Sequence, residues 1–260
     1  MPELLRCSAD GPVAHVRLQR PDVRNALNTE LIEALRSTFA ELAQRSAIRA
    51  IVLSGEGTVF CGGADIAMMR ESLELRHAEN VAGARALSEM YRAIDACPKP
   101  VIAKIHGAAL GGGAGLVAVC DIAIAATDTT FGFTEVKLGI IPAVISPFVL
   151  AKIGASHARA LFLTGERFDA RRALAIGLVH EVVVGDALDL AVERVVGEII
   201  SAGPQAIAAV KQLIARIRET SYAESKEMTA EAIAAQRVSD EGQEGLRAFL
   251  DRRDPAWKKP

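Results

Sequence analysis

Ala109-Leu110-Gly111-Gly112-Gly113-Ala114-Gly115 is the stretch that most constrains the fold of this chain. Its three consecutive glycines stand between an expected strand, Val101 to Ile105, and an apolar segment that suits a helix. Glycine weakens regular structure unless the backbone needs its freedom or its small size. Two interpretations follow from the residue types: a tight strand-to-helix turn, or a loop that presents bare amides at a helix N-terminus to an anionic oxygen.

A companion loop lies earlier in the chain. The run Thr58-Val59-Phe60-Cys61-Gly62-Gly63-Ala64-Asp65-Ile66 follows a β-branched segment from Arg49 to Ser54. Alone it is typical of an ordinary turn. Together, two parallel strand–loop–helix units can each aim one amide at the same oxygen, which is what an oxyanion hole requires. Such a pair polarises a thioester carbonyl and stabilises the enolate formed beside it.

Two nucleotide-binding motifs are disfavoured. Gly107 and Gly112 have the spacing of a phosphate-binding loop, but Gly113 stands where that loop needs its lysine. The glycines do not match the dinucleotide-binding pattern either. The glycine loops therefore point away from nucleotide phosphates.

The composition narrows the class of protein. With 260 residues, half of them hydrophobic, the chain can bury one large core. The net charge is −2 and both signs are interspersed, so we expect no nucleic-acid partner. No apolar run reaches membrane-spanning length without a charged or polar break, and no secretory signal is visible. We therefore expect a cytoplasmic protein that does not bind membranes.

The cysteines and histidines argue against a metal centre. Cys7, Cys61, Cys97 and Cys120 are widely spaced, and the five histidines do not cluster. We expect reduced, mostly buried thiols, and neither a metal nor another cofactor.

Hydrophobic periodicity predicts an α/β core followed by helices. Apolar residues three to four apart indicate a helix from Asn28 to Gln44, with Asn28 as its N-cap. Further strands are expected at Val13 to Leu18, Asp121 to Ala126 and Glu181 to Val184. Beyond about residue 185, helices are expected at Asp186 to Ile200, Pro204 to Ile217, Tyr222 to Val238 and Gly245 to Arg253. The predicted division is residues 1–185 for a core that holds the active site and 186–260 for a helical region.

Ordered motifs carry a resemblance to a known family. The three central ones are Phe60 to Ile66, His106 to Gly113 and Thr134 to Pro142. Flanking matches are Arg20-Pro21, Arg24 to Asn28, Leu163 to Gly165, Ala175 to Val179 and Glu244 to Phe249. In order and spacing, these stretches resemble the enoyl-CoA hydratase/isomerase (crotonase) family over almost the whole chain.

The resemblance implies a crotonase-like spiral of ββα units with a helical C-terminal trimerisation region, assembled as a homotrimer or a dimer of trimers. It implies that the amides of Ala64 and Gly112 form the oxyanion hole, and that CoA arrives as part of the substrate. The residues implied in acyl-CoA binding are Arg24, Ala26, Leu27, Ala64, Asp65, Ile66, Gly111, Gly112, Gly115 and Pro142, with Phe249 and Arg252 closing the CoA site from the last helix. From residue types alone, the last two are equally a core aromatic and a surface arginine.

The hydratases of this family use two glutamates, and this sequence keeps one. The second corresponds to Glu135, whereas the first position, inside the helix after the glycine loop, holds Gly115. By itself Glu135 suggests a surface carboxylate in a first helical turn. Its place in the matched segment predicts instead the catalytic acid and base, with a pKa that burial beside an acyl pocket raises.

The missing glutamate weakens hydration without excluding it. Moving a double bond needs only one base that carries a proton between two carbons. Hydration is also within reach of one carboxylate, if the group deprotonates water and then protonates the carbon on the same face.

A subgroup resemblance favours hydration. The run from Phe133 to Pro147, with Gly112 to Gly115 before it, resembles bacterial members assigned as methylglutaconyl-CoA hydratases of leucine breakdown. In that setting Ser146 either holds a water where the lost carboxylate would act or caps a helix.

Three functions remain after these comparisons. The main prediction is an enzyme, an enoyl-CoA hydratase (hydro-lyase) that acts on a short or branched enoyl-CoA. The alternatives are an enoyl-CoA isomerase with a single glutamate and a non-catalytic acyl-CoA-binding homologue. Retention of Glu135 and of both glycine loops argues against the last, because a scaffold needs neither.

Overall fold

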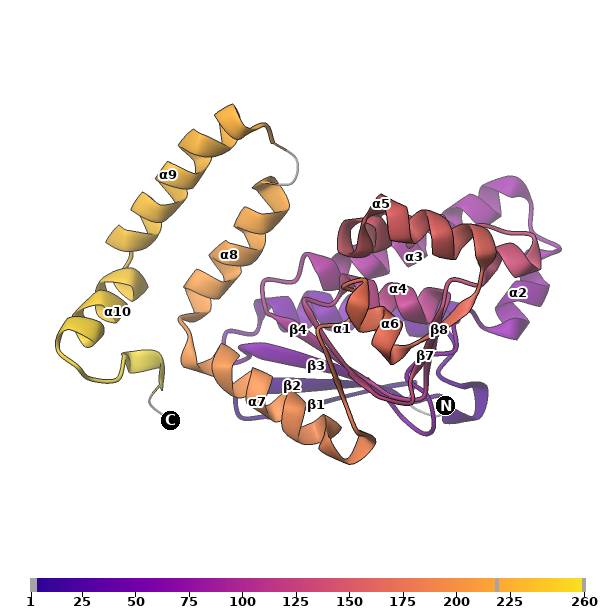
Figure 1. The fold of residues 1–260 in the computed structure, drawn as a ribbon, viewed down its shortest axis with the longest axis horizontal. Coiled ribbons are helices and arrows are strands. Elements are labelled where there is room, and N and C mark those ends of the chain that lie inside the picture. The colour runs from indigo at the N-terminus through magenta and orange to yellow at the C-terminus, as the bar shows by residue number, and fades with distance from the viewer. Residues whose placement is uncertain (1–3, 218–219, 259–260) are drawn as a thin grey trace.

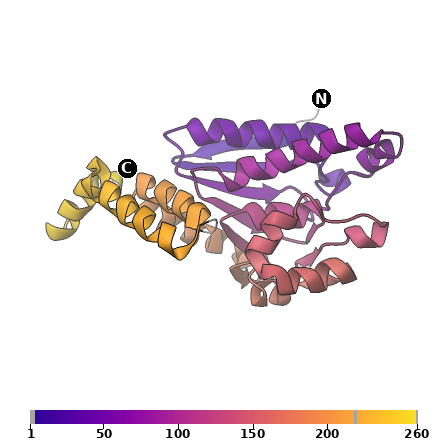
Figure 2. The same cartoon turned by 90° about the horizontal axis from the view of Figure 1, so that it is seen from above.

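The protein folds into an α/β core with a helical arm, as described by a computed structural model for residues 4–217 and 220–258 (Figures 1 and 2). The strands are β1 (Leu5–Asp10), β2 (Val13–Leu18), β3 (Ala50–Gly55), β4 (Val101–Ile105), β5 (Ala108–Leu110), β6 (Ile122–Ala126), β7 (Thr130–Gly132), β8 (Arg167–Asp169) and β9 (Glu181–Val183). The helices are α1 (Thr29–Gln44), α2 (Ile66–Ser72), α3 (His77–Asp95), α4 (Gly112–Val119), α5 (Ser146–Thr164), α6 (Ala170–Ala175), α7 (Leu188–Ser201), α8 (Pro204–Ile217), α9 (Tyr222–Val238) and α10 (Asp240–Leu250). Short 3₁₀ turns are η1 (Pro21–Val23), η2 (Glu135–Leu138), η3 (Gly185–Ala187) and η4 (Ala256–Lys258).

Six strands form the main sheet, in the order β1-β2-β3-β4-β6-β9. All neighbouring pairs are parallel except β1 with β2. A smaller sheet has the order β5-β7-β8, and β5 follows β4 after only two residues. Each central strand therefore delivers its following loop to the same end of the core, where the two glycine loops meet.

Both faces of the main sheet are covered by helices, because alternate strand residues point to opposite sides. Ile51 and Leu53 of β3 face the larger hydrophobic cluster, which includes residues of α1, α3 and α4. Ala50 and Val52 face the other side, where Leu188 and Val192 of α7 pack. The core is thus sealed on both sides without the arm.

Most of the expected elements are confirmed. Helix α1 begins where predicted, and the Asn28 side chain accepts a hydrogen bond from the Leu31 amide as its N-cap. The α/β class and the helical C-terminal region are confirmed as well. Three of the four cysteines are buried and all are free. In the described part of the chain, no helix has the length and apolarity needed to cross a membrane.

Two expectations about helix ends are wrong. Helix α10 begins at Asp240, not at Gly245, because Ser239 caps it through the amide of Gly242. Ser146 does not cap α5: its hydroxyl donates to the Ala143 carbonyl at 2.7 Å, and Ile145 is the N-cap residue.

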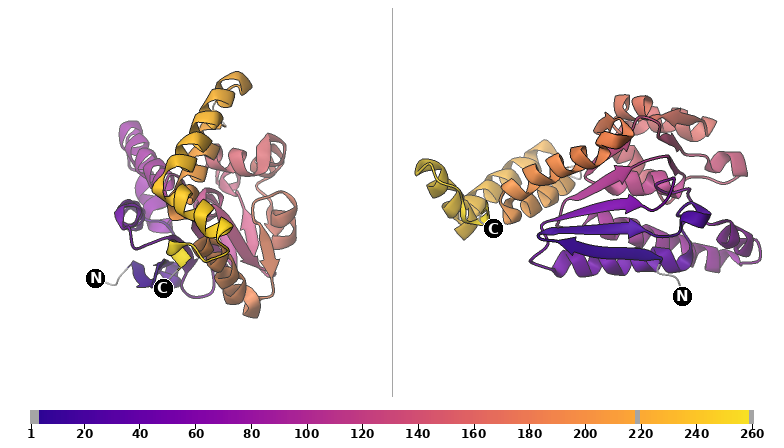
Figure 3. Two further views of the ribbon diagram at one scale, coloured as in Figure 1. Left: turned by 90° about the vertical axis from the view of Figure 1, so that its left-hand side faces the viewer. Right: turned by 90° about the horizontal axis from the view of Figure 1, so that it is seen from below.

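The arm consists of α8, α9 and α10, and it projects away from the core in Figures 1 and 2 and in the right-hand view of Figure 3. Within one chain, no residue described in α8 or α9 is fully buried. The arm is joined to the core by polar contacts, of which the ion pair between Lys211 of α8 and Asp121 at 2.6 Å is one. Its exposed apolar residues include Val210, Ile214, Ile233, Val238, Leu246, Phe249 and Leu250.

Candidate active site

The two glycine loops lie side by side. Cys61 and Ala109 form a parallel β-bridge, in which the Cys61 amide donates to the Ala108 carbonyl and the Cys61 carbonyl accepts from the Leu110 amide. A side chain on Gly63 would begin 2.8 Å from the Leu110 carbonyl oxygen and 3.9 Å from the Gly112 amide nitrogen. The missing side chain at Gly63 therefore lets the first loop approach the start of α4.

The Ala64 amide points away from its neighbouring strand segment. Leu27 bridges to Ala64 by donating to the Gly63 carbonyl and accepting from the Asp65 amide. In a parallel bridge of this kind, the N–H of the central residue faces the opposite side. In the described chain, the Ala64 N–H has no protein acceptor.

The Gly112 amide is one of the unpaired donors at the start of α4. The helix N-cap is Gly111, whose φ of +50° is a conformation that L side chains rarely adopt. The first amides of a helix have no intrahelical acceptor, and within the described residues the Gly112 N–H finds none elsewhere. Two free donors thus stand on adjacent loops, as the oxyanion-hole prediction requires, and the partial positive charge of the helix end adds to them.

Glu135 lies over the N-terminus of α4. It begins η2, and its Oε1 is 3.2 Å from the point where a Gly111 side chain would start. Its Oε2 is buried and has no hydrogen-bond partner. Burial raises the pKa of this carboxyl above its ordinary value, against a smaller lowering effect from its own backbone amide. A half-buried carboxylate with a free oxygen is suited to exchange a proton with a neighbouring group.

Gly115, the position where the family resemblance leads one to expect a second glutamate, is surrounded by buried side chains. A side chain on Gly115 would collide with Cγ2 of Ile145 and would begin 2.9 Å from the Tyr91 hydroxyl oxygen. Both Ile145 and Tyr91 are buried. No second carboxylate fits beside α4 without displacement of these two side chains.

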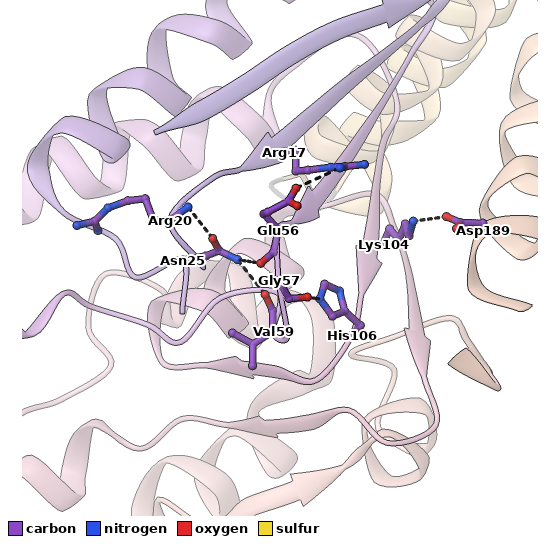
Figure 4. A network of polar contacts seen from close by, with 9 residues as sticks. All are labelled: Arg17, Arg20, Asn25, Glu56, Gly57, Val59, Lys104, His106 and Asp189. Carbon is purple, nitrogen blue, oxygen red and sulfur yellow. Dashed lines mark hydrogen bonds and ion pairs between the residues drawn. The ribbon is translucent and has the colours of Figure 1, made fainter. Parts of the chain in front are cut away.

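The first loop is held by polar groups that the sequence did not single out. Asn25 is fully buried; its side-chain amide donates to the carbonyls of Glu56 and Val59, and its oxygen accepts from the Arg20 amide (Figure 4). The same amide also lies within hydrogen-bond distance of the Phe60 carbonyl. Buried asparagine amides are normally satisfied in this way. The Asn25 motif match was visible in the sequence, but its role as the support of the loop needed the fold.

Asp65, predicted in CoA binding, is already engaged by the protein. It forms an ion pair with Arg20 at 2.8 Å and accepts from the Ala67 amide as the N-cap of α2. Burial alone would raise the pKa of Asp65, but the hydrogen bonds from Arg20 and from backbone amides hold it below its ordinary value. Asp65 therefore fixes the end of the first loop as an anion.

The other residues predicted for the CoA groove differ in their exposure to solvent. Arg24 and Ile66 are exposed beside the first loop, whereas Ala26 and Leu27 are buried beneath it. Pro142 is buried beyond η2. A cavity of about 220 Å³, lined in part by Arg20, Asn28, Asp65 and Met68, lies between the starts of α1 and α2. This cavity therefore lies next to the first glycine loop, where the CoA groove was expected.

Phe249 and Arg252 are not brought to this site within one chain. Phe249 is 81% exposed on α10, so it is no core aromatic, and Arg252 follows that helix. Helices α10 and α2 lie at opposite ends of the molecule (Figure 1). Their predicted role stays a prediction that needs a second subunit.

A second cavity, of about 300 Å³, lies apart from Glu135 and from every residue predicted for the site. Its charged side chains are paired with one another: Arg17 with Glu56 at 3.1 Å, and Lys104 with Asp189 (Figure 4). His106 Nε2 lies 2.9 Å from the Gly57 carbonyl oxygen. The first pair joins β2 to the residue that follows β3, and the second joins β4 to α7.

The chain is similar to known proteins over nearly its whole length. Residues 8–260 match the enoyl-CoA hydratase/isomerase family. A short-chain-enoyl-CoA hydratase of Clostridium acetobutylicum is 31% identical over 247 residues, which cover 94% of this chain and 93% of that protein. The peroxisomal Delta(3,5)-Delta(2,4)-dienoyl-CoA isomerase of Arabidopsis thaliana is 31% identical over 269 residues, covering 99% and 96%.

The solved structures show the same fold. An enoyl-CoA hydratase from Shewanella pealeana superimposes with a TM-score of 0.95 at 38% identity, covering 98% of this chain and 96% of that one. The match runs through the core and the arm alike. This chain belongs to the enoyl-CoA hydratase/isomerase family of the crotonase superfamily.

Proposed function

We propose that the protein adds water across the 2,3 double bond of a short or branched enoyl-CoA. The amides of Ala64 and Gly112 would polarise the thioester carbonyl, and Glu135 would be the one carboxylate that moves protons. The observation that carries this proposal is the carboxyl group of Glu135: its Oε1 lies beside Gly111, at the helix end that bears the free Gly112 amide, and its Oε2 is buried without a partner.

The proposed reaction balances with a single acid and base. Glu135 takes a proton from water as the water oxygen bonds to C3, and the electron pair of the double bond moves onto the thioester oxygen. The two amides stabilise that oxyanion because they are fixed before the charge develops. The protonated Glu135 then returns the proton to C2 on the same face, the carbonyl reforms and the carboxylate is regenerated.

The closed site at Gly115 also favours a second candidate, an enoyl-CoA isomerase. There Glu135 would remove a proton from C2 of a 3-enoyl-CoA and return it to C4, through the same enolate. This route needs no water and no second carboxylate, and the Arabidopsis relative is named as an isomerase. We keep hydration first because of the resemblance of the Phe133 to Pro147 run to methylglutaconyl-CoA hydratases, and we propose 3-methylglutaconyl-CoA, an intermediate of leucine breakdown, as a substrate.

Assembly is part of the proposal. We infer a homotrimer or a dimer of trimers, because α8 and α9 leave their apolar side chains exposed in one chain. Phe249 and Arg252 would then close the CoA site of a neighbouring subunit. We also place the enzyme in the cytoplasm, in line with its four free cysteines. Size-exclusion chromatography with light scattering tests the assembly, and a monomer at micromolar concentration would contradict it.

The assay that tests the function follows the absorbance of the conjugated thioester with crotonyl-CoA, 3-methylglutaconyl-CoA and a 3-enoyl-CoA. Loss of absorbance with either 2-enoyl substrate supports a hydratase. A gain from the 3-enoyl substrate alone supports the isomerase. Binding without change of any substrate would contradict both and leave an acyl-CoA-binding protein.

A further inference from the structure

Three consecutive glycines leave the direction of the Gly112 amide to be set by neighbouring groups, since glycine restricts its own backbone so little. The Gly112 N–H shares its peptide with the Gly111 carbonyl, which accepts from the Gly115 amide at 3.0 Å, and the preceding peptide is held because the Gly111 amide donates to the Gly132 carbonyl at 2.8 Å. On the other side, the hydroxyl of Tyr91 donates to the Gly112 carbonyl oxygen at 2.7 Å. The peptide that bears the Gly112 N–H therefore lies between two peptides that are each held by a hydrogen bond, and Tyr91 supplies the second of these bonds.

Tyr91 reaches this position from α3, outside both glycine loops. Its side chain is completely buried, and its ring lies 5.9 Å from that of Phe148 between centroids. The hydroxyl oxygen lies 3.0 Å from the point where a Gly112 side chain would begin and 2.9 Å from that point for Gly115. The phenol thus takes the space that two missing side chains leave, including that of the family's first glutamate.

The phenol is suited to hold a backbone rather than to exchange protons. Burial raises its pKa well above the ordinary value, and the nearby Cys61 and Glu135 raise it further. It therefore remains a neutral donor over the range in which enzymes work. Complete burial also keeps it from touching the acyl chain, so it acts on the reaction only through the Gly112 peptide.

We propose that Tyr91 is a positioning residue of the oxyanion hole: its hydrogen bond to the Gly112 carbonyl keeps the Gly112 N–H aimed at the thioester oxygen. The inference rests on the proposed function. On this inference, the buried phenol of Tyr91 occupies the space of the family's first glutamate but does not take over its proton transfer.

Tyr91→Phe tests this inference, because it removes one oxygen and keeps the ring. The matched control is Tyr222→Phe, since Tyr222 is the only other tyrosine of the chain and is exposed on α9. Two readouts are needed: kcat and KM with the best enoyl-CoA substrate, and the absorbance of 4-(dimethylamino)cinnamoyl-CoA bound to the protein. The absorbance of this probe moves to longer wavelength as its thioester carbonyl is polarised.

We expect Tyr91→Phe to lower kcat about tenfold with KM within about twofold, and to reduce the wavelength shift of the bound probe. Tyr222→Phe should change neither. Tyr91→Met, which fills much of the volume without a donor, should behave like Tyr91→Phe and serves if the phenylalanine variant does not fold.

Wild-type kcat and an undiminished wavelength shift in a folded Tyr91 variant would overturn the inference while leaving the proposed function intact, even if the melting temperature fell. A wild-type protein that neither shifts the probe nor turns over any enoyl-CoA would overturn the proposed function and this inference with it.

Discussion

Gly111 and Gly115 lie one helical turn apart at the start of α4, yet their surroundings are opposite. Beside Gly111 lies a carboxylate oxygen of Glu135, and the other oxygen of that group is buried without a partner. Against Gly115 lie a methyl group of Ile145 and the hydroxyl of Tyr91. One glycine gives room to the carboxyl group that we propose to be catalytic, and the other gives room to packing. In this chain, the loss of a family glutamate is accompanied by closure of its site.

The largest expected effect on catalysis is that of Glu135, beside Gly111. Glu135→Gln keeps the shape of the side chain but removes its basicity, so kcat should fall about 10³-fold while KM changes by no more than a few fold. Steady-state kinetics on the best enoyl-CoA substrate measure this. Glu227→Gln, an exposed change on α9, is the matched control and should leave turnover unchanged. Normal turnover in Glu135→Gln would remove Glu135 from the mechanism.

The largest expected effect on stability is that of a side chain added at Gly115. Gly115→Ala forces a methyl group against Ile145 and Tyr91, and overpacking of this kind costs about 1–3 kcal/mol of the free energy of unfolding. Gly197→Ala is the control, because it lies in α7 and a side chain there meets nothing within 4 Å. In an exposed helix that change is neutral or stabilising. Denaturant unfolding measures the free energy of unfolding of both variants. Equal values for Gly115→Ala and Gly197→Ala would mean that the space beside Gly115 is open.

The collision at Gly115 can be assigned to Ile145 by a double-mutant cycle. Ile145→Ala removes the methyl group that a new side chain would strike. We therefore expect Gly115→Ala to cost about 1 kcal/mol less in the Ile145→Ala background than in the wild type. Additive free energies of unfolding would show that the Gly115 strain arises elsewhere, with Tyr91 as the remaining neighbour.

The smallest expected effect is the dependence of stability on pH. A carboxyl whose pKa is raised in the folded state binds its proton more tightly there than in the unfolded chain, so its ionised form destabilises the fold. The cost is complete above the raised pKa and is lost as the pH falls below the unfolded value of about 4.3. Glu135→Gln should therefore be slightly more stable than the wild type at pH 7–8, and the gain should vanish below about pH 4. Thermal unfolding at both pH values tests this, and a less stable variant at pH 8 would show that the carboxylate stabilises the fold.

Periodicity was enough to predict the elements that carry a regular apolar pattern. Strands β2 and β4 and helices α8 and α9 match their predicted ranges, and Asn28 caps α1 as expected. Strand β1 was missed because five of its six residues are exposed, so it shows no buried face. The short strands β5, β7 and β8 were also missed, whereas β9, which is equally short, was predicted from its β-branched residues.

Within the site, the sequence identified the groups that would react but not those that hold them. Glu135 and the two glycine loops were found through motifs. Tyr91, Ile145 and Arg20 act through contacts made by folding; Tyr91 and Gly112, for example, are 21 positions apart in the sequence. Such contacts leave no local pattern, and in the sequence a buried tyrosine on a helix looks like any other core residue.

The most direct test of the account is a crystal structure of the Glu135→Gln variant with crotonyl-CoA bound. The account predicts a thioester oxygen about 2.7–3.1 Å from the amide nitrogens of both Ala64 and Gly112, with the side chain at position 135 facing carbons C2 and C3. A thioester oxygen that meets only one of these amides or neither, or a side chain at position 135 that faces solvent, would contradict it.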